Sequence, residues 1–130
     1  MRFNTKLLHG NKMGDANTGA TLTPVYQSSA FYQPSAEQHE KLFHNKATGF
    51  SYTRINNPTI FAFEERMTTL EGGIASVACA SGMAGLTNAL LNIVTCGQEI
   101  VASTSLYGGS IDVFHDFEAF GIKTVFVDIS

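Results

Sequence analysis

The amino-acid sequence predicts an α/β fold in which a parallel β-α-β-α-β unit follows a long extended arm. Three short apolar segments, residues 74–80, 100–103 and 123–128, are typical of strands that are buried on both faces. Apolar residues recur at helical spacing between them, within residues 82–94 and 110–120. The core face of the second of these helices would be Val113, Phe114, Phe117 and Phe120. Because parallel strands need such crossover connections, this order predicts a parallel sheet with right-handed crossovers.

The composition indicates a globular protein and excludes several classes of partner. The chain has 130 residues, of which 44% are hydrophobic and 15% charged, so it can form a modest core and has few charges on its surface. Its net charge is -3 and its basic residues do not cluster, which makes nucleic acid and anionic membranes poor partners. No apolar segment has membrane-spanning length and the N-terminus does not resemble a signal peptide, so we expect a cytoplasmic protein.

The cysteines and histidines give no sign of a metal site or a disulfide framework. Cys79 and Cys96 lack CxxC spacing, and we expect both to be reduced thiols, with Cys79 inside a buried strand. The four histidines do not have the spacing of metal ligands, so no metal is expected.

The N-terminal segment has a different character from the rest. Residues 1–33 show neither helical nor strand periodicity, but the apolar residues in 18–27 indicate an ordered, extended arm. So long a segment without regular structure is unusual in a compact domain, and we expect it to pack against a partner subunit. We therefore divide the chain into residues 1–50, an arm with a short helix, and residues 51–130, the first part of an incomplete large domain.

Two helices in this region have clear start signals. A capping-box pattern places the N-cap of a short helix at Ser35 and its end near Phe43. Asn57 is a suitable N-cap for the next helix, because its side chain can accept from a backbone N–H of the first turn. Pro58 suits the first helical position, because it has no N–H that needs a partner. Gly72, followed by a second glycine, predicts the end of that helix.

The junction at Ser81 and Gly82 joins the first predicted strand to a helix whose apolar face carries Met83, Leu86, Leu90 and Ile93. Such a junction directs free backbone N–H groups and the positive end of the helix dipole toward one point, which suits a phosphate. Gly82 leaves the backbone open to close approach. An ordinary N-cap followed by a tight turn explains the same residues, and the segment alone does not choose between the two interpretations.

Tyr107 occupies the other loop at the carboxyl edge of the predicted sheet, where ligands of open parallel sheets bind. The two glycines that follow leave its ring accessible, and a phenol in this place can stack on a planar cofactor ring. A half-buried tyrosine anchored through its hydroxyl to a loop carbonyl is the alternative.

Tyr52 and Arg54 form a third candidate group, in the loop before the second predicted helix. A phenol and a guanidinium two residues apart can both bind one phosphate. A surface ion pair between Arg54 and Glu64 or Glu65 is the alternative, and spacing alone favours it.

Five segments, residues 19–29, 52–59, 70–73, 81–84 and 106–109, occur in this order along the chain. Together they resemble the Cys/Met-metabolism enzymes that use pyridoxal 5'-phosphate (PLP), a family that includes cystathionine γ-synthase, cystathionine lyases, methionine γ-lyase and O-acetylhomoserine sulfhydrylase. The resemblance extends from about Thr18 to the end of the chain. It implies the N-terminal part of a type I PLP-dependent transferase (aminotransferase-like) fold, with residues 51–130 beginning the PLP-binding large domain.

The resemblance also implies roles for individual residues. The loop that holds the PLP phosphate through backbone N–H groups matches Ser81, Gly82 and Met83. Tyr107 matches the tyrosine that stacks on the pyridine ring, and is the candidate catalytic residue. Tyr52 and Arg54 match the pair that reaches across a dimer interface to the partner's PLP phosphate. The assembly implied is a homo-oligomer, a dimer of dimers that share active sites.

One position narrows the reaction that the resemblance implies. Methionine γ-lyases have a cysteine where this chain has Gly109, and the segment here looks more like that of the homoserine-ester sulfhydrylases. The implied reaction, part of methionine biosynthesis, eliminates acetate from O-acetylhomoserine and adds sulfide to the γ-carbon to give homocysteine, with PLP as the electron sink. A cystathionine γ-synthase or γ-lyase is the alternative within the family.

The family's Schiff-base lysine, pyridinium-pairing aspartate and substrate-binding arginine lie downstream of the Tyr-Gly motif. None of the chain's own lysines has a matching context: Lys6, Lys12, Lys41, Lys46 and Lys123. We therefore expect the 130-residue chain alone to be inactive.

Two non-catalytic alternatives remain. One is a phosphate-ligand binding module, although no GxGxxG or Walker motif is present. The other is an assembly piece whose arm and Tyr52/Arg54 loop bind a complete partner subunit.

Overall fold

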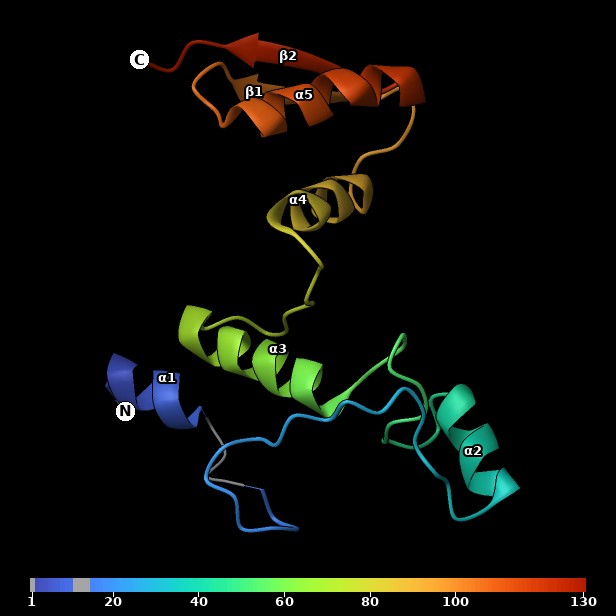
Figure 1. The fold of residues 1–130 in the computed structure, drawn as a ribbon. Coiled ribbons are helices and arrows are strands. Elements are labelled where there is room, and N and C mark those ends of the chain that lie inside the picture. Colours follow the sequence, from blue (N-terminus) through green and yellow to red (C-terminus); the bar gives the residue numbers. More distant parts are fainter. Residues whose placement is uncertain (1, 11–14) are drawn as a thin grey trace. The chain divides into compact units, whose positions relative to one another are not determined.

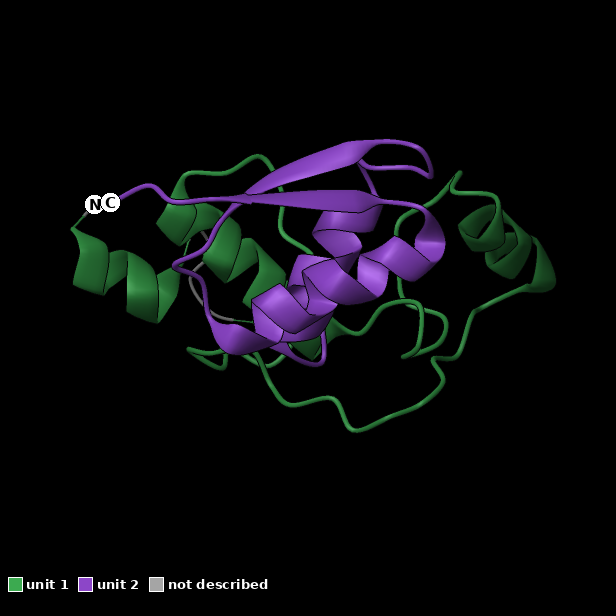
Figure 2. Ribbon diagram, turned by 90° about the horizontal axis from the view of Figure 1, so that it is seen from above, with its two compact units in different colours: residues 1–78 green, residues 79–130 purple. Residues whose placement is uncertain are grey.

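The computed structural model describes residues 2–10 and 15–130, and Lys12 therefore lies outside the described residues. The chain forms two compact units, Met1–Ala78 and Cys79–Ser130 (Figure 2). The first unit contains α1 (Phe3–His9), α2 (Ala36–Phe43) and α3 (Pro58–Glu71) (Figure 1). The second contains α4 (Gly82–Leu91), β1 (Glu99–Ser103), α5 (Gly108–Asp116), the 3-10 helix η1 (Phe117–Phe120) and β2 (Lys123–Val127). No helix in the described ranges is long and apolar enough to cross a membrane.

The second unit is built on two parallel strands. β1 pairs with β2 in a register that runs from Glu99 opposite Lys123 to Ser103 opposite Val127. α5 and η1 form the crossover between the strands. An ion pair of 3.2 Å between Lys123 Nζ and Glu99 Oε1 joins the first rung of the ladder. The second and third strands expected from the sequence are thus confirmed to within a residue, together with their parallel pairing.

The core of this unit gathers aromatic and aliphatic side chains under the sheet. Its buried members are Ala102 of β1, Phe114 of α5, Phe117 of η1, and Ile122 immediately before β2. The Phe114 ring packs edge-on against Phe117 at a centroid distance of 6.4 Å and against Phe126 at 6.1 Å. The ring contacts hold the crossover against β2, and Ala102 brings β1 into the same cluster.

The expectation that Phe120 belongs to the core was wrong. Phe120 is 64% exposed, and Ile122 is the buried residue instead. The reason is a Schellman motif: Gly121 has a left-handed φ of 73°, its N–H donates to Glu118, and the N–H of Ile122 donates to Phe117 O at 3.1 Å. This turn folds the chain back, so Ile122 packs beside Phe117.

The predicted first strand, residues 74–80, is not formed. The segment contains neither helix nor strand, and the sheet of the described residues consists of β1 and β2 alone. A strand exists only through its ladder, and without one Ile74 and Val77 are exposed. Cys79 is exposed as well rather than buried, and both cysteines are free.

Side chains of α3 hold part of this segment instead of a ladder. The Ala78 N–H donates to Glu64 Oε1 at 2.8 Å. Thr68 Oγ1 donates to Ser76 Oγ at 2.9 Å. The residues that precede Cys79 are thereby fastened to the helix of their own unit.

The predicted apolar face of α4 needs one change. α4 ends at Leu91, so Ile93 lies beyond the helix and is exposed. Val94 packs against the core in its place, next to Leu90. The sequence prediction extended the helical spacing of apolar residues to Ile93, whereas the helix ends two residues earlier.

One prediction for the arm is confirmed, and one helix in it was missed. Residues 18–27 contain no helix or strand, as expected of an extended arm. The short helix α1 was not predicted, because seven residues are too few to show a period. Its C-terminal carbonyls are satisfied by a distant residue, since Arg66 Nη1 of α3 donates to Leu7 O and Leu8 O.

Asn57 fastens the arm to the start of α3, and its side chain is almost fully buried, with the residue only 4% exposed. Its Oδ1 accepts from Thr59 N at 2.8 Å, which confirms the N-cap. Its Nδ2 donates to Tyr26 O at 3.0 Å and to Thr53 Oγ1 at 3.1 Å. Thr59 Oγ1 completes the link, because it accepts from Tyr26 N and donates to Pro24 O.

The other expected helix boundaries are confirmed. Ser35 Oγ accepts from Gln38 N at the start of α2, which ends at Phe43. Gly72 ends α3 in the left-handed conformation with a φ of 66°.

Replacing Phe117 or Phe120 by alanine tests the assignment of the core. Phe117→Ala should destabilise the second unit by about 3 kcal/mol, because it empties a buried ring site. Phe120→Ala removes an exposed ring of the same type and should cost about 0.5 kcal/mol or less. Urea unfolding of the two variants measures the difference, and equal losses would contradict the assignment.

Replacing Asn57 by aspartate tests the link between arm and helix. The new carboxylate keeps the acceptor for Thr59 N but loses both Nδ2 donors, so the bond to Tyr26 O is removed. The arm is then held less firmly against α3. The Tyr26 N–H, whose own acceptor is Thr59 Oγ1, should therefore exchange about tenfold faster or more, while the first turn of α3 stays protected. Asn56→Ala, which removes the bond to Gly49 O and leaves the Asn57 side chain unchanged, is the control. Equal exchange at Tyr26 in the two variants would refute the link.

Candidate functional site

Ser81 begins α4 from an extended conformation, with φ -156° and ψ 163°. Its Oγ accepts from Ala84 N at 3.1 Å and its carbonyl accepts from Gly85 N at 3.0 Å. The N-cap interpretation of this residue is therefore confirmed. A cap does not exclude binding, because it occupies one of the donors of the first turn and leaves others free.

The free donors at this helix start are the N–H groups of Gly82 and Met83. As first-turn residues they have no acceptor within the helix, and no hydrogen bond of the described residues involves them. A Cβ built on Gly82 would meet nothing within 4 Å, so space for a ligand adjoins these donors. Two unpaired donors, the positive end of a helix dipole and an open approach fit a phosphate group.

Tyr107 lies at the carboxyl end of β1, where the loop from the strand enters α5. It is the N-cap residue of α5 but makes no side-chain capping bond, and it is 74% exposed. The alternative of a half-buried anchor is thus wrong, and the ring is accessible. Because Thr104 N donates to Val127 O beyond the last strand rung, the loop continues the sheet edge at which ligands of such folds bind.

Asp128 follows β2 at the same edge, and the sequence did not single it out. Its Oδ1 accepts from the N–H of Ser130 at 2.9 Å, and this bond lowers the pKa of the carboxyl from its ordinary value. The residue is therefore an anion at neutral pH. Only its place as the last residue of the predicted strand 123–128 could have drawn attention to it.

Tyr52 and Arg54 lie together in the first unit, as their spacing predicted. The guanidinium carbon of Arg54 lies 5.2 Å from the centroid of the Tyr52 ring, within the range of a cation–π contact. A tight turn brings them together, because Ile55 N and Asn56 N both donate to Tyr52 O. Arg54 is placed on this ring rather than beside Glu64, whose carboxylate accepts from Ala78 N.

A short bridge to the arm supports this turn from below. Tyr52 pairs with Ala30 in an isolated antiparallel bridge, and Thr53 N donates to Ser29 O at 2.9 Å. The Thr53 hydroxyl donates to Ser28 O. The turn that carries both candidate side chains is thus anchored on the 19–29 segment, while Tyr52 itself remains 41% exposed.

The structure places the predicted residues in two groups. Ser81, Gly82, Met83 and Tyr107 belong to Cys79–Ser130, and in this unit α4 contacts α5. Tyr52 and Arg54 belong to Met1–Ala78. In the described ranges no cluster of three His, Cys, Asp or Glu side chains could hold a metal ion.

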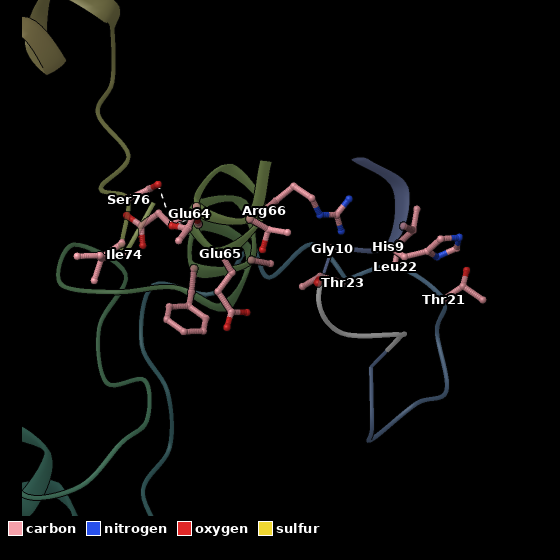
Figure 3. A pocket seen from close by; sticks show the side chains of 15 residues that line it. His9, Gly10, Thr21, Leu22, Thr23, Glu64, Glu65, Arg66, Ile74 and Ser76 are labelled. Carbon is pink, nitrogen blue, oxygen red and sulfur yellow. Dashed lines mark hydrogen bonds between the residues drawn. The ribbon is translucent and has the colours of Figure 1, made fainter. Parts of the chain in front are cut away.

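A cavity of about 370 Å³ in the first unit includes none of the predicted residues. It lies between the end of α1, the arm near Thr21 to Thr23, α3 and residues 74–76 (Figure 3). Arg66 points from α3 toward Gly10, in keeping with its bonds to the end of α1 (Figure 3). The walls of the cavity are therefore formed partly by residues that hold α1 in place.

Known proteins resemble the chain over nearly its whole length. The O-acetyl-L-homoserine sulfhydrylase of Leptospira meyeri is 44% identical over 127 residues, which are 97% of this chain and 29% of that protein. The cystathionine gamma-lyase of Bacillus subtilis is 39% identical over 131 aligned positions, covering 100% of this chain and 32% of that protein. The chain thus spans about a third of the length of these relatives.

A solved structure shows the same fold. The putative O-acetylhomoserine (thiol)-lyase of Campylobacter jejuni superposes with a TM-score of 0.89 at 31% identity, over 99% of this chain and 32% of that one. That structure contains N'-pyridoxyl-lysine-5'-monophosphate. The expected fold class, the N-terminal part of a type I PLP-dependent transferase, is confirmed.

The five ordered segments, the parallel sheet and this structural likeness lead to one conclusion. The family model of the Cys/Met metabolism PLP-dependent enzymes matches residues 4–130, and the chain belongs to that family.

Proposed function

We propose that this chain binds the phosphate of PLP in an enzyme that makes homocysteine from O-acetylhomoserine and sulfide, releasing acetate. The observation that carries the choice of reaction is the 44% identity to the sulfhydrylase of L. meyeri, against 39% to the γ-lyase of B. subtilis. Gly109, where the resemblance places a cysteine in methionine γ-lyases, supports the same choice.

The start of α4 is the proposed phosphate site. Gly82 and Met83 donate their free N–H groups to phosphate oxygens, and the helix dipole adds a favourable interaction with the negative charge. Ser81 orders the turn through its bond to Ala84 N, which keeps both donors pointing the same way. No side chain at Gly82 obstructs the approach.

Tyr107 is the proposed partner of the planar ring. Its exposed phenol, at the carboxyl edge of the sheet, can stack on the pyridine ring and keep water from that side. PLP, when bound, supplies an electron sink for carbanion steps at the amino-acid substrate. The role of Tyr107 is thus to orient that ring.

Tyr52 and Arg54 are proposed to bind the phosphate of a second copy's cofactor. The cation–π contact already holds the guanidinium beside the phenol, so both donors can reach one anion together. Residues 1–50 would then pack on a partner subunit, in a cytoplasmic homo-oligomer that shares its active sites. Support comes from the first unit itself, since no apolar side chain is fully buried among its described residues.

A second function within the family has an observation in its favour. The B. subtilis cystathionine gamma-lyase matches the entire chain at 39% identity, only slightly below the sulfhydrylase. Cleavage or formation of cystathionine is therefore the alternative reaction.

An assay of the natural polypeptide that contains residues 1–130 decides between these reactions. With O-acetylhomoserine and sulfide we expect homocysteine and acetate in equal amounts. Turnover with cystathionine should be at least about tenfold slower in kcat/KM, a difference of roughly 1.4 kcal/mol in transition-state binding. Preferential turnover of cystathionine would overturn the sulfhydrylase assignment in favour of the alternative.

Two substitutions of Ser81 test the phosphate site. Ser81→Asp keeps an N-cap acceptor but adds a negative charge, so stability should change little while PLP binding weakens by about tenfold or more. Ser81→Ala loses the cap and about 1 kcal/mol of stability, yet adds no repulsion. Thermal unfolding and titration with PLP give the two readings. Unchanged PLP affinity in Ser81→Asp would refute the phosphate site.

A further inference from the structure

Gly109 is in unusually close contact with the ring of Tyr107. A Cβ built on Gly109 would lie 2.7 Å from Tyr107 Cε1, 3.4 Å from Cδ1 and 3.5 Å from Cζ. A carbon–carbon distance of 2.7 Å lies far inside van der Waals contact, which begins near 3.5 Å. The ring therefore occupies the space that any other residue at position 109 would fill.

The neighbouring glycine has no such contact. A Cβ on Gly108 would meet nothing within 4 Å, although both glycines lie in the first turn of α5. Neither has a positive φ, so the backbone conformation does not require glycine at either position. Alanine is favoured over glycine by up to about 1 kcal/mol in a helix, and the ring contact is a reason for glycine that position 109 has and position 108 lacks.

The ring of Tyr107 has little else to fix its place. It makes no side-chain capping bond to α5, and most of its surface is exposed. An unrestrained side chain of this kind exchanges among staggered rotamers. Because Gly109 has no side chain, one of these rotamers can place the Cδ1–Cε1–Cζ edge of the ring next to the α5 backbone.

We propose that Gly109 is a positioning residue for Tyr107, whose ring lies against the first turn of α5 only because position 109 has no side chain. Any larger residue displaces the ring and changes what it presents at the carboxyl edge of the sheet. The consequence for the cofactor rests on the proposed function, in which Tyr107 stacks on the pyridine ring. The placement of the ring does not depend on that function.

The test compares Gly109→Ala with the matched control Gly108→Ala. Both variants gain the same helix propensity, so a difference between them reports the ring contact. In the parent chain we expect nuclear Overhauser contacts from the Tyr107 ring protons to the α protons of Gly109. These contacts and the ring chemical shifts should persist in Gly108→Ala and be lost in Gly109→Ala. Retention of the same ring position in Gly109→Ala would overturn the proposal.

A double-mutant cycle of unfolding free energies tests the proposal even where a variant folds poorly. Gly109→Ala should be less stable than Gly108→Ala in the parent chain, and the two should become equal in a Tyr107→Ala background, where no ring remains to be displaced. A difference that persists without the ring would show that Gly109 serves the backbone alone, and would overturn the proposal.

Titration of the natural polypeptide with PLP separates this inference from the proposed function. If Tyr107 stacks on the cofactor, Gly109→Ala should weaken PLP binding about three- to tenfold, and Gly108→Ala should leave it unchanged. Ring displacement in Gly109→Ala with unchanged PLP affinity, also in Tyr107→Leu, would support the positioning role and refute the stacking role.

Discussion

The requirement that backbone polar groups at helix ends find partners governs this structure. Arg66 satisfies the end of α1, Asn57 caps the start of α3, and Gly121 closes the last turn of η1. α3 and α4 use the same kind of cap with different results. At α3 the first position is Pro58, which has no N–H, whereas at α4 Gly82 and Met83 keep theirs. One helix start is thus purely structural and the other remains available to an anion.

Each of the two units is stabilised internally by a different kind of interaction. Aromatic and aliphatic packing around Phe114 and Phe117 organises the second unit. In the described part of the first unit the buried side chain is polar: Asn57 joins α3 to the arm through hydrogen bonds. Each such bond contributes only about 1 kcal/mol in net terms, much less than a packed core. A segment held in this way gains most from a further surface to pack on, in line with the proposed partner subunit.

Besides the parallel pairing of β1 and β2, most of what the sequence could predict was local. Caps at Ser35 and Asn57 and the stop at Gly72 depend on residues within one turn, and all three were confirmed. The errors concern a missing strand partner and the exact ends of helices. Residues 74–80 have the composition of a strand, but a strand requires a neighbour that composition does not reveal. Helical period placed Phe120 in the core, whereas the turn at Gly121 put Ile122 there.

The candidate site shows the same division. Ser81 was singled out because a serine followed by glycine at the start of a helical period can be recognised from sequence, although the strand expected before it is not formed. Tyr107 was singled out because it follows a predicted strand at the edge of the sheet. The residues themselves indicated only that the Gly-Gly pair leaves the Tyr107 ring accessible, and Gly109 differed from Gly108 only through the family resemblance. The structure separates them, because the space above Gly108 is empty and the space above Gly109 contains the ring. A glycine can therefore act in a site through the side chain that its missing Cβ admits, and only coordinates identify which side chain that is.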